Sequence, residues 1–518
     1  MDTASSVQKT TTSDQKICFF LQRRFAYVGH TMAITFKKKY GLNQFCGYVQ
    51  LRDSFEFLKS QKDIAYTKLL LEEDIQKQYE SEPLDLNYIK YLEREYGIPN
   101  LWPFIDTDRI IRYNLLVREY PYDTPTYTHE EMMRILQVQA KAIIKFLKEE
   151  RPNLIIFSVV GALSSLLLYY IAKKEGIRTL VIQRSRIGNK FSLTENYDDA
   201  GYLGKSFDEI QKDNAPDQTY IKQAEEFLNN FRDKPSPYSI AVTPKGRPTS
   251  RKKQFAFLAP GHLLKSIGWF LEVLRHYLSD KNRDDYSTIK PWYFLWDRIK
   301  RKTRVLRGFD DLYDAINLDE DFAFFPLQAV PEISTMLHSP FYMDQLWLIK
   351  QIARSLPLHY KLYVKEAPAM FGYRPRRYYK ELKKIPNVKL INPTIISFDL
   401  IKNSKIVLTN TATSGLEALF FKKPVITFGH AFYNILPMVK RCRAIEDLPV
   451  MIREQLENFQ HDEKALIYFI AALYKESVDV DLIQLWNVEG NAEMEKKERE
   501  LIPLVDLIAE KIKLKPVT

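Results

Sequence analysis

Short apolar segments alternate with helical patterns along residues 321–428, and this alternation constrains the fold more than any other feature of the sequence. Each apolar segment has the length and the β-branched or aromatic content of a buried strand. The expected strands are residues 322–326, 360–365, 388–391, 405–409 and 424–428, separated by expected helices at 344–356, 378–384, 400–403 and 415–421. Such strand–helix–strand units form a parallel α/β sheet, which binds ligands at the carboxyl ends of its strands.

A looser alternation in the first 200 residues predicts a second α/β sheet. Its expected strands are 16–22, 44–50, 153–158 and 179–183, with long helices at 60–80 and 129–150. Residues 153–172 carry no charge and are long enough to cross a membrane. Gly161 interrupts this run, and Ser164 and Ser165 can open a helix that ends near Gly176. These signals favour a strand–loop–helix unit over a membrane span.

The length of 518 residues suggests two to four domains. Turn residues and changes in composition divide the chain further. The expected parts are a disordered tail at 1–15, an N-terminal domain at 16–231, a linker with a basic and aromatic insertion at 232–318, a C-terminal domain at 319–475 and a helical tail at 476–518.

The insertion combines tryptophans with a run of positive charge. Trp269, Trp292 and Trp296 lie close to six Lys or Arg residues between Asp297 and Arg307. This composition suits an interfacial helix on an anionic membrane, which would be peripheral contact with an inner-membrane surface. The alternative is an insertion packed on the protein with a solvated basic face, since charge runs usually face solvent.

Charge and cysteine content limit the class of protein. The net charge of +11 indicates an anionic partner, but no helix-turn-helix, RNP or zinc motif supports nucleic acid. The three distant cysteines fit a reducing compartment, and the polar N-terminus lacks the apolar core of a signal peptide, so we expect a cytoplasmic protein. Asp-x-Asp pairs occur, yet none follows a strand of the C-terminal domain, and we expect no metal and no cofactor.

The segment KIVLTNTATSGLEALFFKKPVITFGHAFYN, residues 405–434, carries the clearest chemical signal. A strand ends and a helix begins after small and hydroxylated residues, which creates an anion site of free N–H groups. Thr413 and Ser414 can donate to a phosphate, and Gly415 lets a ligand approach the backbone. Glu417 can accept from a ribose hydroxyl or complement the helix dipole. The alternative is an ordinary capped helix between two strands.

The same segment resembles the capsule polysaccharide biosynthesis family, which includes Kdo transferases. The family has a T-x-T-x-G-x-E-A-L motif followed by G-K-P-V and F-G-x-x-F-Y. Matching residues here are Thr411, Thr413, Gly415, Glu417, Ala418, Leu419, Lys423, Pro424, Val425, Phe428, Gly429, Phe432 and Tyr433, while Lys422 replaces a glycine. The resemblance is strong over residues 319–440 and weaker at 152–197.

The resemblance implies a glycosyltransferase of surface polysaccharide synthesis with two Rossmann-like domains facing a cleft, as in GT-B enzymes. The C-terminal domain would hold a nucleotide sugar, CMP-Kdo being one candidate. The N-terminal domain would hold a glycan or lipid-linked acceptor. A trailing helix often returns to the first domain in such enzymes, and residues 497–514 have the periodicity for it.

The implied chemistry needs a carboxylate near the anomeric carbon and positive groups at the leaving phosphate. Glu332 is the first candidate carboxylate, with Glu366 and Glu195 in reserve. The candidate binding residues are Lys365, Arg374, Thr411, Thr413, Ser414, Gly415, Glu417, His430 and Tyr433.

Ala367 stands where the family has a histidine thought to contact the donor phosphates. An alanine side chain can neither carry charge nor donate a hydrogen bond. Three interpretations follow: other groups hold the phosphate, the donor differs from CMP-Kdo, or catalysis is weakened. The competing hypothesis is therefore a non-catalytic scaffold that binds glycan or nucleotide within an assembly complex.

Overall fold

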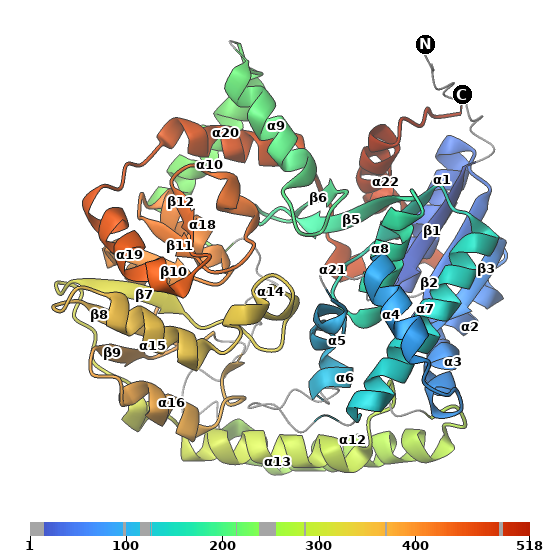
Figure 1. Ribbon diagram of the computed structural model, residues 1–518, viewed down its shortest axis with the longest axis horizontal. Helices are drawn as coiled ribbons and strands as arrows, with labels where there is room; N and C mark the ends of the chain where they lie inside the picture. The colour runs from blue at the N-terminus through green and yellow to red at the C-terminus, as the bar shows by residue number, and fades with distance from the viewer. Residues whose placement is uncertain are drawn as a thin grey trace. The chain divides into compact units, whose positions relative to one another are not determined.

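The computed structural model describes residues 15–96, 100–113, 125, 127–213, 215–237, 255–283, 286–367, 370–485 and 491–517. These residues form an α/β protein with two Rossmann-like sheets, each in its own compact unit (Figure 1). The expected α/β class with parallel sheets is confirmed. Most of the expected tail at 1–15 and part of the expected linker and insertion at 232–318 lie outside the described residues.

The first unit contains a seven-stranded sheet in the order β13-β6-β5-β4-β1-β2-β3. Six strands run in one direction, and β6 runs antiparallel to its neighbours β5 and β13. The strands are β1 (Lys16–Leu21), β2 (Gln44–Val49), β3 (Tyr66–Leu71), β4 (Leu154–Phe157), β5 (Arg178–Arg184), β6 (Lys190–Thr194) and β13 (Ser477–Asp479). Its helices include α1 (Phe25–Tyr40), α2 (Arg52–Ser60), α3 (Glu72–Gln76), α4 (Leu86–Tyr96), α7 (His129–Glu150) and α8 (Leu163–Lys174).

Two features of this unit bear on the sequence-based expectations. The uncharged run forms β4 and α8, so the strand–loop–helix interpretation is confirmed, and no helix among the described residues is long and apolar enough to cross a membrane. The long helix expected at residues 60–80 is wrong. Its centre forms β3, because the β-favouring Tyr66–Leu71 pairs with β2, and a helix starts only at the acidic residues that follow.

The second unit contains a six-stranded sheet in the order β12-β11-β10-β7-β8-β9, with every pair parallel. Its strands are β7 (Phe322–Pro326), β8 (Lys361–Lys365), β9 (Val388–Ile391), β10 (Ile406–Thr409), β11 (Val425–Thr427) and β12 (Val439–Arg441). The connecting helices are α14 (Ile333–Met336), α15 (Gln345–Ser355), α16 (Arg376–Lys383), α17 (Ser397–Asn403), α18 (Thr413–Phe420) and α19 (Leu448–Glu457). Strand order reverses between β7 and β10, and ligands of such sheets bind at this point.

The expected boundary at residue 231 does not match the packing. Helices α9 (Gly201–Lys212) and α10 (Gln218–Asp233) belong to the second unit, where they pack against α20 (Glu463–Lys475). Phe231 of α10 lies 4.9 Å from Phe420 between ring centroids, and Arg232 pairs with Glu463 at 2.6 Å. These aromatic and ionic contacts are long-range, so turn signals in the sequence do not reveal them.

The C-terminal tail belongs to the first unit. Helix α22 (Asn491–Lys511) packs on α1, and Lys39 pairs with Asp506 at 2.7 Å. The expected helical tail also contains β13, which extends the first sheet. Further α-helices among the described residues are α5 (Trp102–Thr107), α6 (Arg109–Tyr113), α12 (Pro260–Ser279), α13 (Pro291–Arg307) and α21 (Leu482–Leu485).

Candidate functional site

The loop after β10 leads into an open helix N-terminus. Ala412 precedes α18, and its side chain makes no hydrogen bond to the first turn. Thr413 and Ser414 are partly exposed, and their hydroxyls have no partner within the described part of the chain. The first N–H groups of an α-helix lack intrahelical acceptors, and the helix dipole is positive there. The turn therefore offers N–H and O–H donors to an anion.

Thr411 is turned into the protein. Its hydroxyl donates to the Ser334 carbonyl at 3.0 Å, and its N–H donates to Gln328 Oε1 at 3.1 Å. The Gln328 amide also donates back to Thr411 Oγ1 at 3.2 Å. Because Gln328 follows β7 and Thr411 follows β10, these bonds tie the two loops together where strand order reverses. Thr411 holds the loops in place and does not present its hydroxyl outward.

Gly415 and Tyr433 shape the same turn from inside. A Cβ on Gly415 would overlap the Tyr433 hydroxyl and lie 2.9 Å from its ring carbon Cζ. Tyr433 is fully buried and donates to the Ala412 carbonyl at 2.6 Å. Burial, followed by the Glu417 charge, raises the pKa of Tyr433. The glycine is therefore needed for an internal tyrosine, not for the approach of a ligand as we expected from the sequence.

Lys365 and Glu417 both have shifted pKa values, and the charge of each opposes the shift of the other. Lys365 ends β8, is only 4% exposed, and donates to Ser397 Oγ at 2.9 Å. Burial lowers the pKa of Lys365 to about 8, although the Glu366 and Glu417 carboxylates oppose this shift. Burial raises the pKa of Glu417 to about 7, with Lys365 opposing. Both groups therefore titrate near neutrality, which is common at sites of binding and catalysis.

Glu366 is held by partners on all sides. It forms a buried ion pair with Arg374, and the two side chains are 1% and 0% exposed. The Tyr379 hydroxyl donates to the Glu366 carboxylate at 2.8 Å, and the Ala367 N–H donates to it at 2.7 Å. Arg374 also donates to the Gln328 carbonyl at 2.7 Å. These contacts make Glu366 and Arg374 structural, and they leave neither available to a substrate.

Glu332 remains as an exposed carboxylate on the loop between β7 and α14. Its N–H donates to Thr335 Oγ1 at 3.3 Å, and this bond fixes the backbone at the start of α14. The loop follows the carboxyl end of β7, the edge at which parallel sheets bind ligands. Of the three candidate carboxylates, Glu332 alone is both exposed and on this edge.

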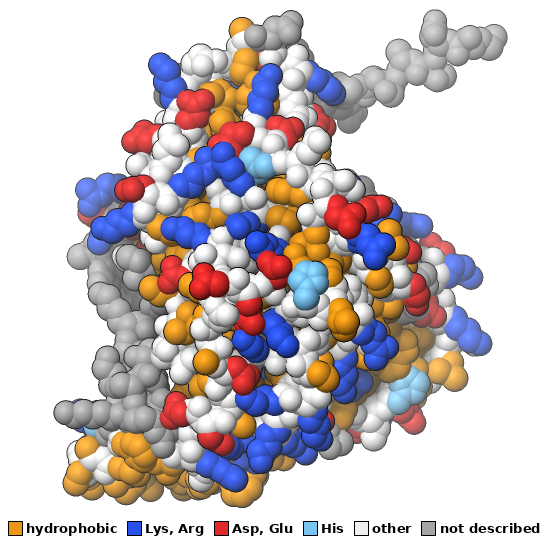
Figure 2. Space-filling view, turned by 90° about the vertical axis from the view of Figure 1, so that its left-hand side faces the viewer, with side chains coloured by type: hydrophobic (Ala, Val, Ile, Leu, Met, Phe, Trp, Pro, Cys, Tyr) orange, Lys and Arg blue, Asp and Glu red, His pale blue; other side chains and the backbone are white. Residues whose placement is uncertain are grey.

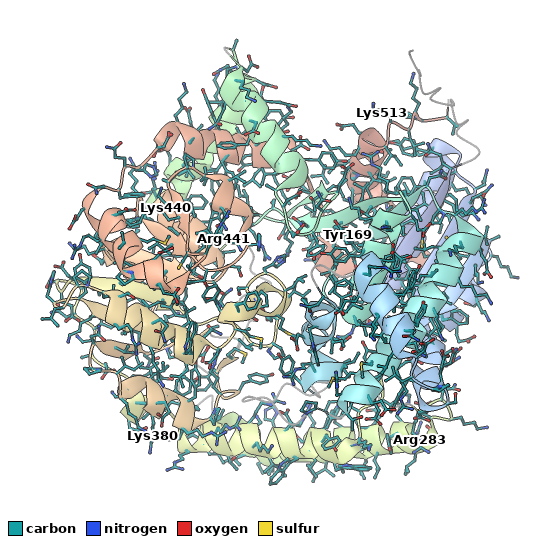
Figure 3. The ribbon with its side chains drawn as sticks, viewed as in Figure 1. Tyr169, Arg283, Lys380, Lys440, Arg441 and Lys513 are labelled. Atoms are coloured by element: carbon teal, nitrogen blue, oxygen red, sulfur yellow. The ribbon has the colours of Figure 1, made fainter. Side chains whose placement is uncertain are left out.

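His430 lies in a basic cluster that the sequence analysis missed. Its ring Nδ1 is 3.2 Å from the Arg441 guanidinium, and the backbone N–H of His430 donates to the His338 carbonyl at 2.8 Å. Burial and the Arg441 charge lower the pKa of His430, while Asp198 opposes them. Arg441 ends β12 (Figure 3), and its Nε is buried without an acceptor among the described residues. Two arginines at and just after the end of a short strand, as in VKRCR, were the available signal.

Glu195 belongs to the first sheet and lies near the amino end of β5. Because β6 is antiparallel to β5, the residue after β6 reaches the amino end of β5. There Glu195 pairs with Arg178 at 2.7 Å, and its carbonyl accepts from Thr179 at 2.9 Å. Glu195 therefore lies at the amino end of β5, not at the carboxyl ends of the parallel strands, where such sheets bind ligands.

Comparisons with known proteins match parts of the chain to a family model and to a curated relative. Residues 271–447 match the family model described as "Capsule polysaccharide biosynthesis protein". Protein FixF of Sinorhizobium fredii is 31% identical over 135 residues, which are 25% of this chain and 31% of that protein, so the match spans about a third of this curated relative.

Solved structures of low identity also match. Thermosulfurimonas dismutans KpsC, beta Kdo 2,7 transferase, is 14% identical with a TM-score of 0.35, covering 76% of this chain and 95% of that one. The S. aureus MnaA-UDP co-structure is 11% identical with a TM-score of 0.28, covering 96% and 97%.

Proposed function

Residues 271–447 belong to the capsule polysaccharide biosynthesis family, and from this premise we propose that the chain is a glycosyltransferase that uses a nucleotide-activated sugar. Its product would be a capsule or another surface polysaccharide. The donor would bind at the carboxyl edge of the second sheet. The acceptor would be a glycan or a lipid-linked glycan.

The observation that carries this proposal is the open first turn of α18. Thr413 and Ser414 hold unpaired hydroxyls beside the free N–H groups of the helix, within the described part of the chain. This arrangement suits a phosphate of the donor. Glu417 lies in the next turn, where its carboxyl group would accept a hydrogen bond from a ribose hydroxyl. Tyr433 and Gly415 would keep the turn in shape beneath the ligand.

Charge at the same edge supports a role in leaving-group stabilisation. A nucleotide leaves with a developing negative charge on its phosphate, which fixed donors and cations stabilise. Lys365 and the cluster of His430 and Arg441 supply positive charge without a metal. In this proposal, Lys365, His430 and Arg441 contact the donor phosphates in place of the family histidine, whose position is Ala367 in this chain. Glu332 would face the anomeric carbon as the catalytic carboxylate.

The donor is tested by thermal shift with CMP, UDP, GDP and their sugars. A nucleotide that binds only the folded chain raises its melting temperature, and about a hundredfold excess over Kd adds roughly 2.7 kcal/mol to the free energy of unfolding. We expect CMP or its sugar to give the largest rise. The variant Thr413→Ala/Ser414→Ala should weaken that nucleotide about tenfold or more, because hydrogen bonds to charged groups contribute about 1.5–3 kcal/mol each.

Ser355→Ala provides the matched control. Ser355 ends α15, at the far end of that helix from the carboxyl edge, and its hydroxyl donates to the Gln351 carbonyl at 2.8 Å and to no other described residue. It should leave nucleotide binding unchanged. If no nucleotide shifts the melting temperature, the scaffold hypothesis is favoured. If a nucleotide binds equally well to the double variant, the pocket lies elsewhere.

A further inference from the structure

Helix α12 exposes a continuous apolar stripe. All 20 of its residues are described, and none is buried. Leu264, Ile267, Leu271 and Leu278 are 70%, 57%, 58% and 65% exposed. Their spacing of three, four and seven residues places them on one face of the helix. A surface helix of a soluble protein normally turns such a stripe toward its own core.

Helix α13 repeats the pattern with tryptophans. Trp292, Leu295, Trp296 and Ile299 are 53%, 42%, 56% and 43% exposed. They stand at positions i, i+3, i+4 and i+7, which share one helix face. Each tryptophan is among the largest apolar side chains, so leaving two of them in water on a single face costs much hydrophobic free energy.

The opposite face of α13 is polar and attaches the helix to the second unit. Asp297, which is 4% exposed, pairs with Arg301 at 2.8 Å. Arg301 donates to the Tyr373 hydroxyl at 3.2 Å, and Arg304 donates to the Tyr373 carbonyl. Charged side chains thus face the protein while apolar ones face outward. The amphipathic polarity of α13 is inverted relative to a helix that packs on a soluble core.

The two helices are joined and carry positive charge along the apolar surface. Trp269 of α12 contacts Phe294 of α13 at 5.6 Å between ring centroids, and Arg298 lies 3.6 Å over the Trp269 ring. Lys302 and Arg307 are exposed beside the apolar face of α13. Figure 2 shows hydrophobic side chains gathered at the lower left, at the level where α12 and α13 lie in Figure 1, with Lys and Arg side chains beside them.

We propose that α12 and α13 dock on the surface of an anionic lipid bilayer. Helices in a membrane interface bury apolar side chains at the boundary of headgroups and acyl chains, place tryptophan at the headgroup level, and direct Lys and Arg to lipid phosphates. The outward face of this helical hairpin supplies all three. A protein partner would not require the basic margin, whereas an anionic membrane attracts it.

This inference goes beyond sugar transfer and rests on different residues from those of the candidate site. It also replaces the simpler of the two sequence-based interpretations. An insertion packed on the protein with a solvated basic face would bury its tryptophans. Instead, part of the basic run of α13 faces the protein and the tryptophans face outward.

Vesicle flotation with the full chain tests the proposal. The wild-type protein should float with vesicles of phosphatidylglycerol and phosphatidylcholine, and much less with phosphatidylcholine alone. Trp292→Ser/Trp296→Ser/Ile299→Ser should reduce the fraction bound by about tenfold or more, since apolar burial contributes most of interfacial binding. Lys302→Glu/Arg307→Glu should remove the preference for the anionic vesicles, and salt should weaken wild-type binding.

The matched control is Phe341→Ser/Leu358→Ser/Val450→Ser, which removes three exposed apolar side chains elsewhere in the second unit. It should float like the wild type. Both triple variants change exposed positions, and circular dichroism melting checks that they are folded. The proposal is overturned if the wild type does not bind anionic vesicles or if the tryptophan variant binds equally. It is also overturned if the wild type is a dimer that this variant converts to a monomer, since a second copy then covers the face.

Discussion

At the residue scale, two glutamates have different roles because their surroundings differ. Glu366 and Glu417 are both carboxylates near Lys365. Glu366 is saturated by Arg374, Tyr379 and a backbone N–H, so it is fixed as a structural anion. Glu417 has no such set of donors, and burial raises its pKa to about 7.

The buried pair predicts a large effect on the free energy of unfolding. Arg374→Met leaves Glu366 buried without its cation, and breaking such a pair costs about 3–5 kcal/mol. Thermal or urea unfolding measures the loss. Glu381→Gln removes a pair in which Lys384 and Glu381 are 70% and 43% exposed, and it should change the free energy of unfolding far less, because water screens exposed pairs. Equal effects of the two variants would contradict the structural role of Glu366.

Glu417 predicts a pH dependence with a definite sign. Its pKa in the folded chain is raised to about 7. Between the ordinary carboxyl pKa and pH 7, the folded chain therefore retains a proton that the unfolded chain has already released. The contribution of Glu417 to the free energy of unfolding therefore falls as pH rises from the ordinary carboxyl range to about 7, and this contribution is level above pH 7.

Glu417→Gln removes this titration. Its melting temperature relative to the wild type should rise by roughly 2 °C or more between about pH 5 and pH 8. Glu226→Gln, at an exposed position of α10, is the control and should show no such trend. A constant offset at every pH would show that the folded chain does not raise the pKa of Glu417.

At the element scale, α18 depends on a contact across 18 residues of sequence. In most helices Ala is preferred to Gly by about 1 kcal/mol. In α18 the space for a Cβ on Gly415 is filled by Tyr433, whose hydroxyl bonds to the residue before the helix. Packing, not helix propensity, therefore decides this position.

Gly415→Ala should lower the free energy of unfolding by about 1–3 kcal/mol, as overpacking does, although the substitution favours helix formation. Adding Tyr433→Phe should recover part of the loss, because the closest contact is with the hydroxyl. The double-mutant cycle in urea unfolding measures this coupling. Additive losses would mean that Tyr433 does not fill the space beneath α18.

At the scale of the whole molecule, sequence order and spatial grouping differ. The first unit takes its last strand and helix from the C-terminal end, and the second unit takes α9 and α10 from before the insertion. Each unit has its own sheet and its own buried core. A chain of this kind is not expected to unfold in one two-state step.

Calorimetry should therefore resolve two transitions. Ile508→Ala, in the buried face of α22, should lower the temperature of one transition, and Leu408→Ala, in β10, should lower that of the other. Each substitution should reduce the free energy of unfolding of its own unit by about 2–5 kcal/mol. The nucleotide that binds the candidate site should raise only the transition that Leu408→Ala lowers. A single transition shifted by both substitutions would contradict two separately stable units.

Local patterns predicted five of the six strands of the second sheet, and β7 and β9 have the bounds expected from their apolar runs, but the short edge strand β12 was not predicted. They also located the helix that follows KIVLTNTATSG. They failed where the decisive contact was distant, as at β3, whose strand state depends on pairing with β2. For the site, local patterns identified the residue types. They did not reveal that the Glu366 and Tyr433 side chains are buried and hydrogen-bonded inside the protein, or that the Arg441 side chain contacts the His430 ring.

The sequence by itself determined the α/β class, the parallel second sheet and the open turn before α18, because apolar periodicity, strand length and small residues act within a few positions of each other. Only the tertiary structure decided which charges are enclosed, to which unit α9, α10 and α22 belong, and that α13 turns its tryptophans outward. Those outcomes depend on partners far away in the sequence, and burial and pairing set their energies.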